Sequence, residues 1–123
     1  PQAQRGGSMS AKVETIQSTS SGIIGRAVSH VRGQQLTLDS STAPRPDAFT
    51  NSEAFLAAVS SCGVTLVEGH AKDTGVPLQR MAVTIEGTRN PGEARFVSVA
   101  MRFELHGVSQ DQADALVEIY RQR

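Results

Sequence analysis

The chain has 123 residues and carries 12 Lys and Arg against 12 Asp and Glu, so its formal net charge is zero. This balance excludes a strongly basic surface for nucleic acid, and the single cysteine excludes a disulfide within these residues. The length is typical of one domain, and the apolar runs are only a few residues long, so we expect no membrane-spanning helix.

The first residues indicate where the folded part begins. Residues 1–8 are polar and flexible, and Met9 follows them. We therefore interpret 1–8 as an expression remnant or a disordered arm, and 9–123 as a single domain. No apolar signal-peptide segment follows Met9, and a lone cysteine is typical of a reducing compartment. Both features predict a cytoplasmic protein.

The N-terminal part of the sequence predicts a small antiparallel sheet. Two strands are expected at Ile23–Val31 and Gln34–Asp39, joined by a hairpin turn at Arg32–Gly33. A weaker strand is expected at Lys12–Ser18. The segment 40–49 has two prolines and no periodicity, so it predicts a loop.

A long apolar helix is predicted next. Thr50 and Glu53 have the spacing of a capping box, the apolar pattern continues to about Asp73, and Gly75 and Pro77 end it. Because apolar residues occupy a wide arc of this helix, we expect it to be central and covered on more than one side.

The last third predicts two strands and a helix. Residues 81–86 and 97–105 alternate between apolar and polar, with a turn at Asn90–Gly92 between them. Ser109 and Gln112 have capping-box spacing at the start of the last helix. The order predicts an α+β fold with largely antiparallel sheets. Since Arg123 comes where this helix should complete its packing, the helix is short or the chain lacks its natural C-terminus.

Cys62 is the strongest nucleophile in the sequence. A free cysteine among apolar helical neighbours is more often buried and inert than reactive. Cys62 also lies three turns inside the helix, where the helix dipole no longer lowers a thiol pKa. A reactive Cys62 therefore needs a cation or a hydrogen-bond donor from elsewhere.

The residues around Cys62 indicate self-association. Ala57, Ala58, Ser60, Ser61 and Gly63 are small, and small residues on a helix let another backbone approach closely. The chain has no second long helix to fill that place, so a second copy is the simplest partner.

No metal or cofactor site is predicted. Cys62 and His70 lie about 80° apart around the helix and about 12 Å along it, too far to bind one metal ion together. His30 and His106 are isolated, and no glycine-rich phosphate loop is present.

The helix sequence resembles the motif of the OsmC/Ohr family. Residues Asn51–Cys62 read Asn-Ser-Glu-Ala-Phe-Leu-Ala-Ala-Val-Ser-Ser-Cys, close to the family form Pro-x-Glu-Leu-Leu-Leu-Ala-Ala-Leu-x-Ser-Cys. The order of elements from about Ala11 to Arg123 is also similar. The resemblance implies an OsmC-like fold, an intertwined homodimer in which two sheets enclose the central helices.

The resemblance implies a thiol-dependent peroxide reductase for oxidative-stress defence. Cys62 matches the peroxidatic cysteine, which reduces an organic hydroperoxide and is regenerated by a thiol reductant. Glu53 matches a common family glutamate, and Arg26 is the nearest basic residue in the strand that carries the activating arginine of the Ohr branch. That arginine itself aligns with Ile23, and the Ohr glutamate with Ser52. The chain is therefore similar to the looser OsmC-like group.

Two alternatives stay open at the level of sequence. One is a non-catalytic OsmC-like dimer that binds a small apolar molecule in its interface pocket. The other is a structural domain in which Cys62 is inert. The family's second cysteine would follow Arg123.

Overall fold

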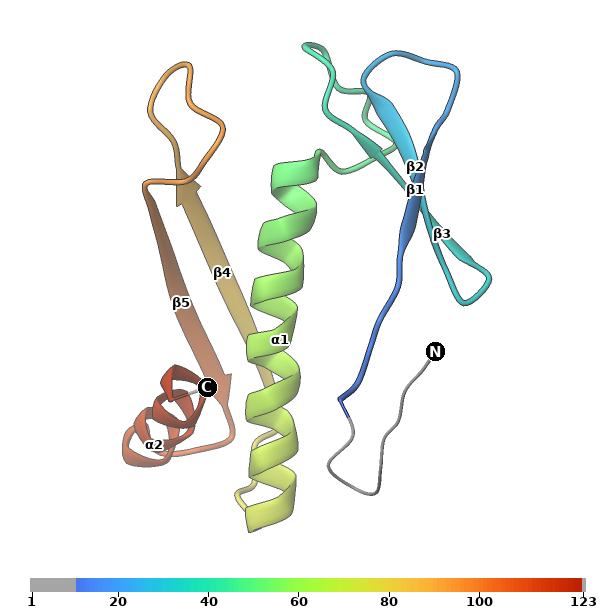
Figure 1. Cartoon of the computed structure of the whole chain (residues 1–123). Helices are drawn as coiled ribbons and strands as arrows, with labels where there is room; N and C mark the ends of the chain where they lie inside the picture. Colours follow the sequence, from blue (N-terminus) through green and yellow to red (C-terminus); the bar gives the residue numbers. More distant parts are fainter. Residues whose placement is uncertain (1–10, 123) are drawn as a thin grey trace. The chain divides into compact units, whose positions relative to one another are not determined.

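The computed structural model describes residues 11–122, so residues 1–8, interpreted above as a remnant or arm, lie outside the described part. The element order is three strands, a long helix, two strands and a helix, which confirms the predicted α+β fold (Figure 1). Contacts group the chain into two compact units, with the boundary along the sequence between Asn51 and Ser52. Each unit is described separately.

The N-terminal unit is a three-stranded antiparallel sheet in the order β1-β2-β3. Its strands are β1 (Gln17–Ser20), β2 (Arg26–Val31) and β3 (Gln34–Asp39). Arg32 and Gly33 both have positive φ, at 51° and 80°, which is the geometry of a tight two-residue hairpin turn. The predicted hairpin and its turn are confirmed.

Two strand boundaries differ from the sequence prediction. β2 begins at Arg26, not Ile23, because residues 21–25 form a turn in which the Arg26 amide donates to the Ile23 carbonyl at 3.1 Å. β1 spans Gln17–Ser20, not Lys12–Ser18. Gln17 pairs with His30 close to the hairpin turn, so residues before it have no strand to pair with.

The C-terminal unit contains α1 (Asn51–Thr74), β4 (Arg80–Thr88), β5 (Ser98–His106) and α2 (Gln110–Arg121). The hairpin of β4 and β5 runs alongside α1, and α2 packs near the end of β5 (Figure 1). The strands are antiparallel, so the alternating apolar residues of both share one face. Three residues of the helices form the buried centre: Val67, Ala71 and Leu116, at 0, 2 and 3 % exposure.

Helix ends follow their sequence signals. α1 begins directly after Thr50 and ends at Thr74, and Gly75 follows it with a φ of 73°. The amides of Gly75 and Val76 donate to the carbonyls of Lys72 and Ala71, a Schellman motif. α2 is preceded by a complete capping box between Ser109 and Gln112.

Candidate functional site

Cys62 lies in the middle of α1 with its thiol exposed. The buried residues of α1 are Gly63, Val67 and Ala71, which recur every four residues and face the core of the C-terminal unit. Successive helical residues are about 100° apart, so Cys62 lies beside that buried side and not on it. The structure therefore does not bury the Cys62 thiol in the core of this unit, although burial is the commoner arrangement for a free cysteine.

Cys62 belongs to an exposed line of residues along α1, which we call the Cys62 stripe. Its members share one side of the helix because they are spaced by three and four residues: Phe55, Ala58, Cys62, Thr65 and Gly69. Each is exposed in the chain. The Thr65 hydroxyl donates to the Cys62 carbonyl at 3.3 Å. The stripe thus presents a thiol among apolar and small side chains.

Gly63 does not belong to this stripe. A Cβ at Gly63 would lie 3.4 Å from Cε2 of Phe103, 3.5 Å from Cε1 of Tyr120 and 3.6 Å from Cε of Met101. The absence of a side chain at Gly63 therefore lets β5 and α2 of the same unit pack closely against α1. The prediction that Gly63 forms part of an intermolecular contact is wrong. Ala58 and Ser61 are exposed and stay available to one.

Glu53 lies in the first turn of α1, where an acid also suits the helix dipole. It precedes Cys62 by nine residues, which in a continuous helix is about 13 Å along the axis and the opposite side. The structure does not bring the Glu53 carboxylate to the thiol of the same chain. A catalytic role for Glu53 stays a prediction.

Arg26, on β2 of the N-terminal unit, is held by two carboxylates. Its Nη1 donates to Asp39 at 2.8 Å and to Asp47 at 3.1 Å, and its Nη2 donates to Asp47 at 3.3 Å. The side chains of Arg26 and Asp39 are 9 % and 1 % exposed. The hydrogen bonds that Arg26 donates to Asp47 and then to Asp39 raise the pKa of Arg26 above its ordinary value, and the bond from Arg26 lowers the pKa of Asp47.

Asp39 organises the loop that leads to α1. Its carboxylate accepts hydrogen bonds from the Ser41 hydroxyl at 2.6 Å, from the Ser41 amide at 3.0 Å and from the Arg45 amide at 3.0 Å. These hydrogen bonds, together with the one from Arg26, hold the pKa of Asp39 well below its usual range. The bond from the Ser41 hydroxyl has the largest effect on this pKa and the bond from Arg26 the smallest. This cluster was not predicted from the sequence. The hairpin turn at 32–33 sets a register in which Arg26 lies opposite Asp39. This pairing is the part of the cluster that the sequence could have indicated.

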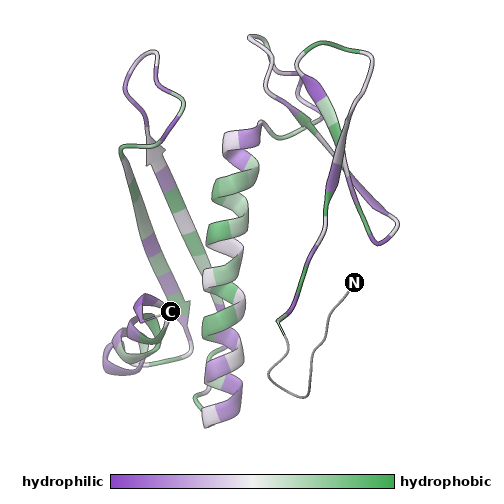
Figure 2. Ribbon diagram, in the orientation of Figure 1, coloured by the Kyte–Doolittle hydropathy of each residue, from purple (hydrophilic) through white to green (hydrophobic). Residues whose placement is uncertain are grey.

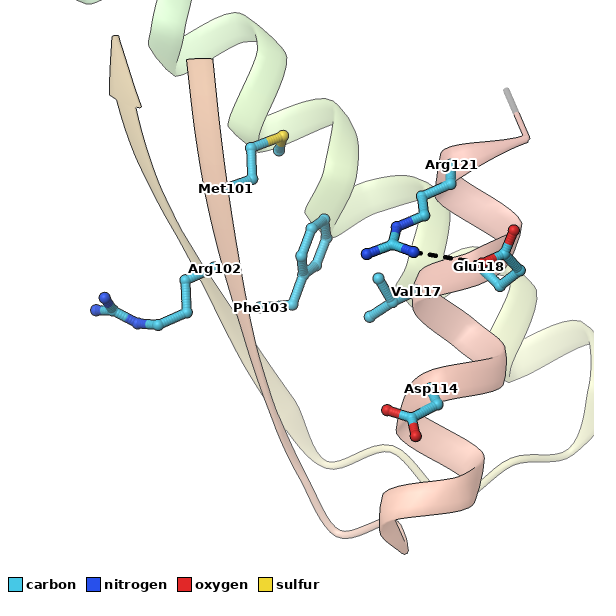
Figure 3. Close-up of a pocket in the computed structure, with 7 residues that line it drawn as sticks. All are labelled: Met101, Arg102, Phe103, Asp114, Val117, Glu118 and Arg121. Carbon is cyan, nitrogen blue, oxygen red and sulfur yellow. Dashed lines mark ion pairs between the residues drawn. The ribbon is translucent and has the colours of Figure 1, made fainter. Parts of the chain in front are cut away.

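Among the hollows lined by described residues, three lie on the C-terminal unit, and Cys62 does not line any of these three. The hollow in Figure 3, of about 400 Å³, lies between β5 and α2. Met101, Phe103 and Val117 supply its apolar wall, and Glu118 pairs with Arg121 at 3.6 Å along its edge. A second hollow of about 250 Å³ includes Thr65 and Gly69 of the Cys62 stripe together with His70. Within residues 11–122, no three His, Cys, Asp or Glu side chains gather as metal ligands.

The apolar character of α1 is high for a helix so little covered. Figure 2 shows apolar residues through its middle turns and polar ones in its last turns. By length and by a mean hydropathy of 1.3 over 18 residues, α1 could cross a membrane, although the core helix of a globular protein has the same properties. Only 17 % of that window is buried inside the chain.

The comparison with protein families identifies a family for this sequence. The sequence profile of OsmC-like proteins matches residues 44–123, a stretch that includes all of α1. A comparison with curated proteins gives no significant match.

Several solved structures have a similar fold. An OsmC-like protein from Mycoplasma pneumoniae is 16 % identical, with a TM-score of 0.78 over 91 % of this chain and 82 % of that one. An organic hydroperoxide resistance protein OsmC from Legionella pneumophila is 19 % identical, with a TM-score of 0.66 over 89 % and 82 %. The organic hydroperoxide resistance protein OhrB of Bacillus subtilis is 13 % identical, with a TM-score of 0.54 over 87 % and 82 %. At these identities the likeness concerns the fold alone.

Proposed function

The chain belongs to the family of OsmC-like proteins, and we propose that it is a thiol-dependent reductase of organic hydroperoxides with Cys62 as its nucleophile. The observation that carries the proposal is the exposed Cys62 thiol in the middle of the apolar helix α1. Two proteins of similar fold are named organic hydroperoxide resistance proteins, which supports the same reaction class.

The proposed reaction begins with the Cys62 thiolate. The sulfur attacks the terminal oxygen of R–O–OH, the O–O bond breaks, and the alkoxide takes a proton and leaves as an alcohol. Cys62 becomes a sulfenic acid, oxidised by two electrons. One reductant thiol condenses with it, releasing water and forming a mixed disulfide, and a second thiol attacks that disulfide and restores Cys62. Because the 123 residues contain one cysteine, both thiols come from outside these residues.

Activation of the Cys62 thiol needs a cation or a hydrogen-bond donor from outside α1. The Cys62 position gains little from the helix dipole, which fades within one turn of the end. Arg26 stays the sequence-predicted activator, but its guanidinium charge is already matched by Asp39 and Asp47 within the N-terminal unit. We expect Arg26→Ala to disturb that unit before it changes the thiol pKa. A basic residue of a second copy of the chain is the other source that we propose.

A homodimer is part of the same proposal. α1 is apolar and little buried, and exposed members of the Cys62 stripe such as Phe55 and Ala58 are suited to a second copy. Sedimentation equilibrium should show a dimer at micromolar concentration. A stable monomer with a protease-resistant α1 would contradict this.

The deciding experiment measures the reactivity of Cys62 directly. Alkylation of the thiol against pH should give an apparent pKa below about 7, whereas free cysteine titrates near 8.5. Adding cumene hydroperoxide should consume the thiol rapidly and yield a sulfenic acid that a dimedone probe traps. Cys62→Ser is the matched control and should react with neither reagent. A thiol that titrates above about 9 and ignores hydroperoxide would favour the non-catalytic dimer that binds an apolar molecule.

A further inference from the structure

Met101 carries a nucleophilic sulfur that the proposed reaction does not use. Its side chain projects from β5 toward the helices, as that of Phe103 does, whereas the side chain of Arg102 projects to the other face of the strand (Figure 3). The terminal methyl group of Met101 reaches α1, because a Cβ at Gly63 would lie 3.6 Å from Cε of Met101. The thioether therefore lies against the helix that carries Cys62.

A hydroxyl group lies on the Met101 sulfur. Tyr120, near the end of α2, donates a hydrogen bond from its hydroxyl to this sulfur at 3.6 Å. The ring of Phe103 packs against the Tyr120 ring, with centroids 5.5 Å apart and planes inclined by 56°, and so helps to hold the hydroxyl in place. A thioether sulfur is a weak acceptor. The hydroxyl is therefore available to a stronger acceptor that comes to the sulfur, such as a peroxide or sulfoxide oxygen.

Small molecules can reach Met101 from solvent. The residue is only half-buried, and it lines the hollow of about 400 Å³ between β5 and α2. The wall of this hollow is apolar at Phe103 and Val117, and its edge carries the ion pair of Glu118 and Arg121. An uncharged peroxide therefore meets no unpaired charge of that edge pair on its way to the sulfur.

We propose that Met101 is a modification site, at which a peroxide in this hollow converts the thioether to a sulfoxide with the Tyr120 hydroxyl as hydrogen-bond donor. A sulfur lone pair attacks the terminal oxygen of R–O–OH, where R is hydrogen or a small organic group, and the O–O bond breaks. The leaving oxygen takes a proton and becomes water or an alcohol. The hydroxyl now on sulfur loses its proton, which leaves the sulfoxide. Met101 is oxidised by two electrons, and the peroxide is reduced by two.

Oxidation of Met101 changes the junction of β5 with the two helices. A flexible apolar side chain becomes a polar one, beside the buried Gly63 backbone and the Tyr120 ring. A hydrogen bond from Tyr120 to the sulfoxide oxygen offsets only part of the cost of placing that oxygen in an apolar contact. The sulfoxide should therefore loosen the packing of α2 and lower the stability of the C-terminal unit.

The test follows the oxidation of single methionines by hydrogen peroxide in Cys62→Ser, which lacks the thiol. Met81 is the internal reference, because it is also half-buried, borders a different hollow and packs on the buried centre. Trypsin places the two methionines in separate peptides, 81–89 and 96–102, whose sulfoxides are counted by mass spectrometry. In the folded protein Met101 should be oxidised roughly three-fold faster than Met81, and the ratio should fall to about one in concentrated urea. A ratio of one or less in the folded protein would overturn the inference.

A matched pair of variants tests the hydroxyl. Tyr120→Phe removes it but keeps the ring, and should lower the Met101 to Met81 ratio roughly three-fold. Val117→Ala widens the same hollow but keeps the hydroxyl, and should not lower the ratio. An equal fall in both variants would show that packing around the hollow sets the ratio, which contradicts the role of Tyr120. An unchanged or higher ratio in Tyr120→Phe would contradict it as well.

The structural consequence is measured by urea unfolding before and after oxidation. Oxidation should lower the midpoint of Cys62→Ser by roughly 0.5 M and leave that of Cys62→Ser with Met101→Leu unchanged. An equal fall in both proteins would show that another residue is responsible, and would overturn the assignment to Met101. The inference goes beyond the proposed function and does not depend on it, because every protein in these tests lacks the Cys62 thiol.

Discussion

Substitutions at Gly63 test whether this side of α1 packs against the strands of its own chain or against a second copy. The perturbation is a pair of substitutions, Gly63→Ala and Gly63→Leu, at a buried position one residue after Cys62. The alanine Cβ would meet Phe103, Tyr120 and Met101 at 3.4 to 3.6 Å, which is ordinary contact. No clash therefore opposes the helix propensity that alanine gains over glycine, about 0.8–1 kcal/mol.

The two substitutions should change stability in opposite directions. We expect Gly63→Ala to raise the free energy of unfolding by about 0.5–1 kcal/mol. In Gly63→Leu, the atoms beyond Cβ must displace the rings of Phe103 and Tyr120, and such overpacking costs about 1–3 kcal/mol. After the same gain in helix propensity is subtracted, Gly63→Leu should lower the free energy of unfolding by up to about 2 kcal/mol.

The assay is urea unfolding followed by far-UV circular dichroism at one fixed protein concentration, because association with a second copy would itself change apparent stability. Sedimentation equilibrium on the same samples reports the oligomeric state. A Gly63→Leu protein that keeps its unfolding midpoint but no longer associates would refute the reasoning, since Gly63 would then face a partner. A strongly destabilised Gly63→Ala would also refute it.

Three further outcomes follow from the structure. Asp39 has a lowered pKa in the folded chain, so its contribution to stability is full above its unfolded pKa of about 3.9 and is lost as pH falls toward the lower folded value. Asp39→Asn should therefore lower the thermal midpoint at pH 7 and flatten its fall below about pH 4, measured by melts across pH. Gly87→Ala should displace the Phe96 ring and lower the urea midpoint, whereas Gly92→Ala, with open space around it but a φ of 80°, should cost only backbone strain. Elemental analysis of protein purified without chelator should find no stoichiometric zinc or iron, and one metal per chain, lost in His70→Ala, would overturn that expectation.

The helices, the hairpin turn and the order of the strands followed from the sequence because their signals are local. The hairpin turn at Arg32–Gly33 sets the register that places Arg26 opposite Asp39. The ends of α1 and α2 follow from Thr50, from Gly75 and from the Ser109 capping box. The same local pattern placed Cys62 in the middle of a long apolar helix.

The tertiary structure alone decided what each side of that helix touches. Helical spacing gives the angle between Cys62 and Gly63, but it does not say which of them faces the strands, because both lie on apolar arcs. Packing against Phe103 and Tyr120 turned Gly63 inward and left the thiol outside. In the same way, only the fold of loop 40–49 brought Asp47 to Arg26, and only the loop after β4 brought Phe96 to Phe55. These contacts join residues far apart in sequence, where no local pattern records the pairing.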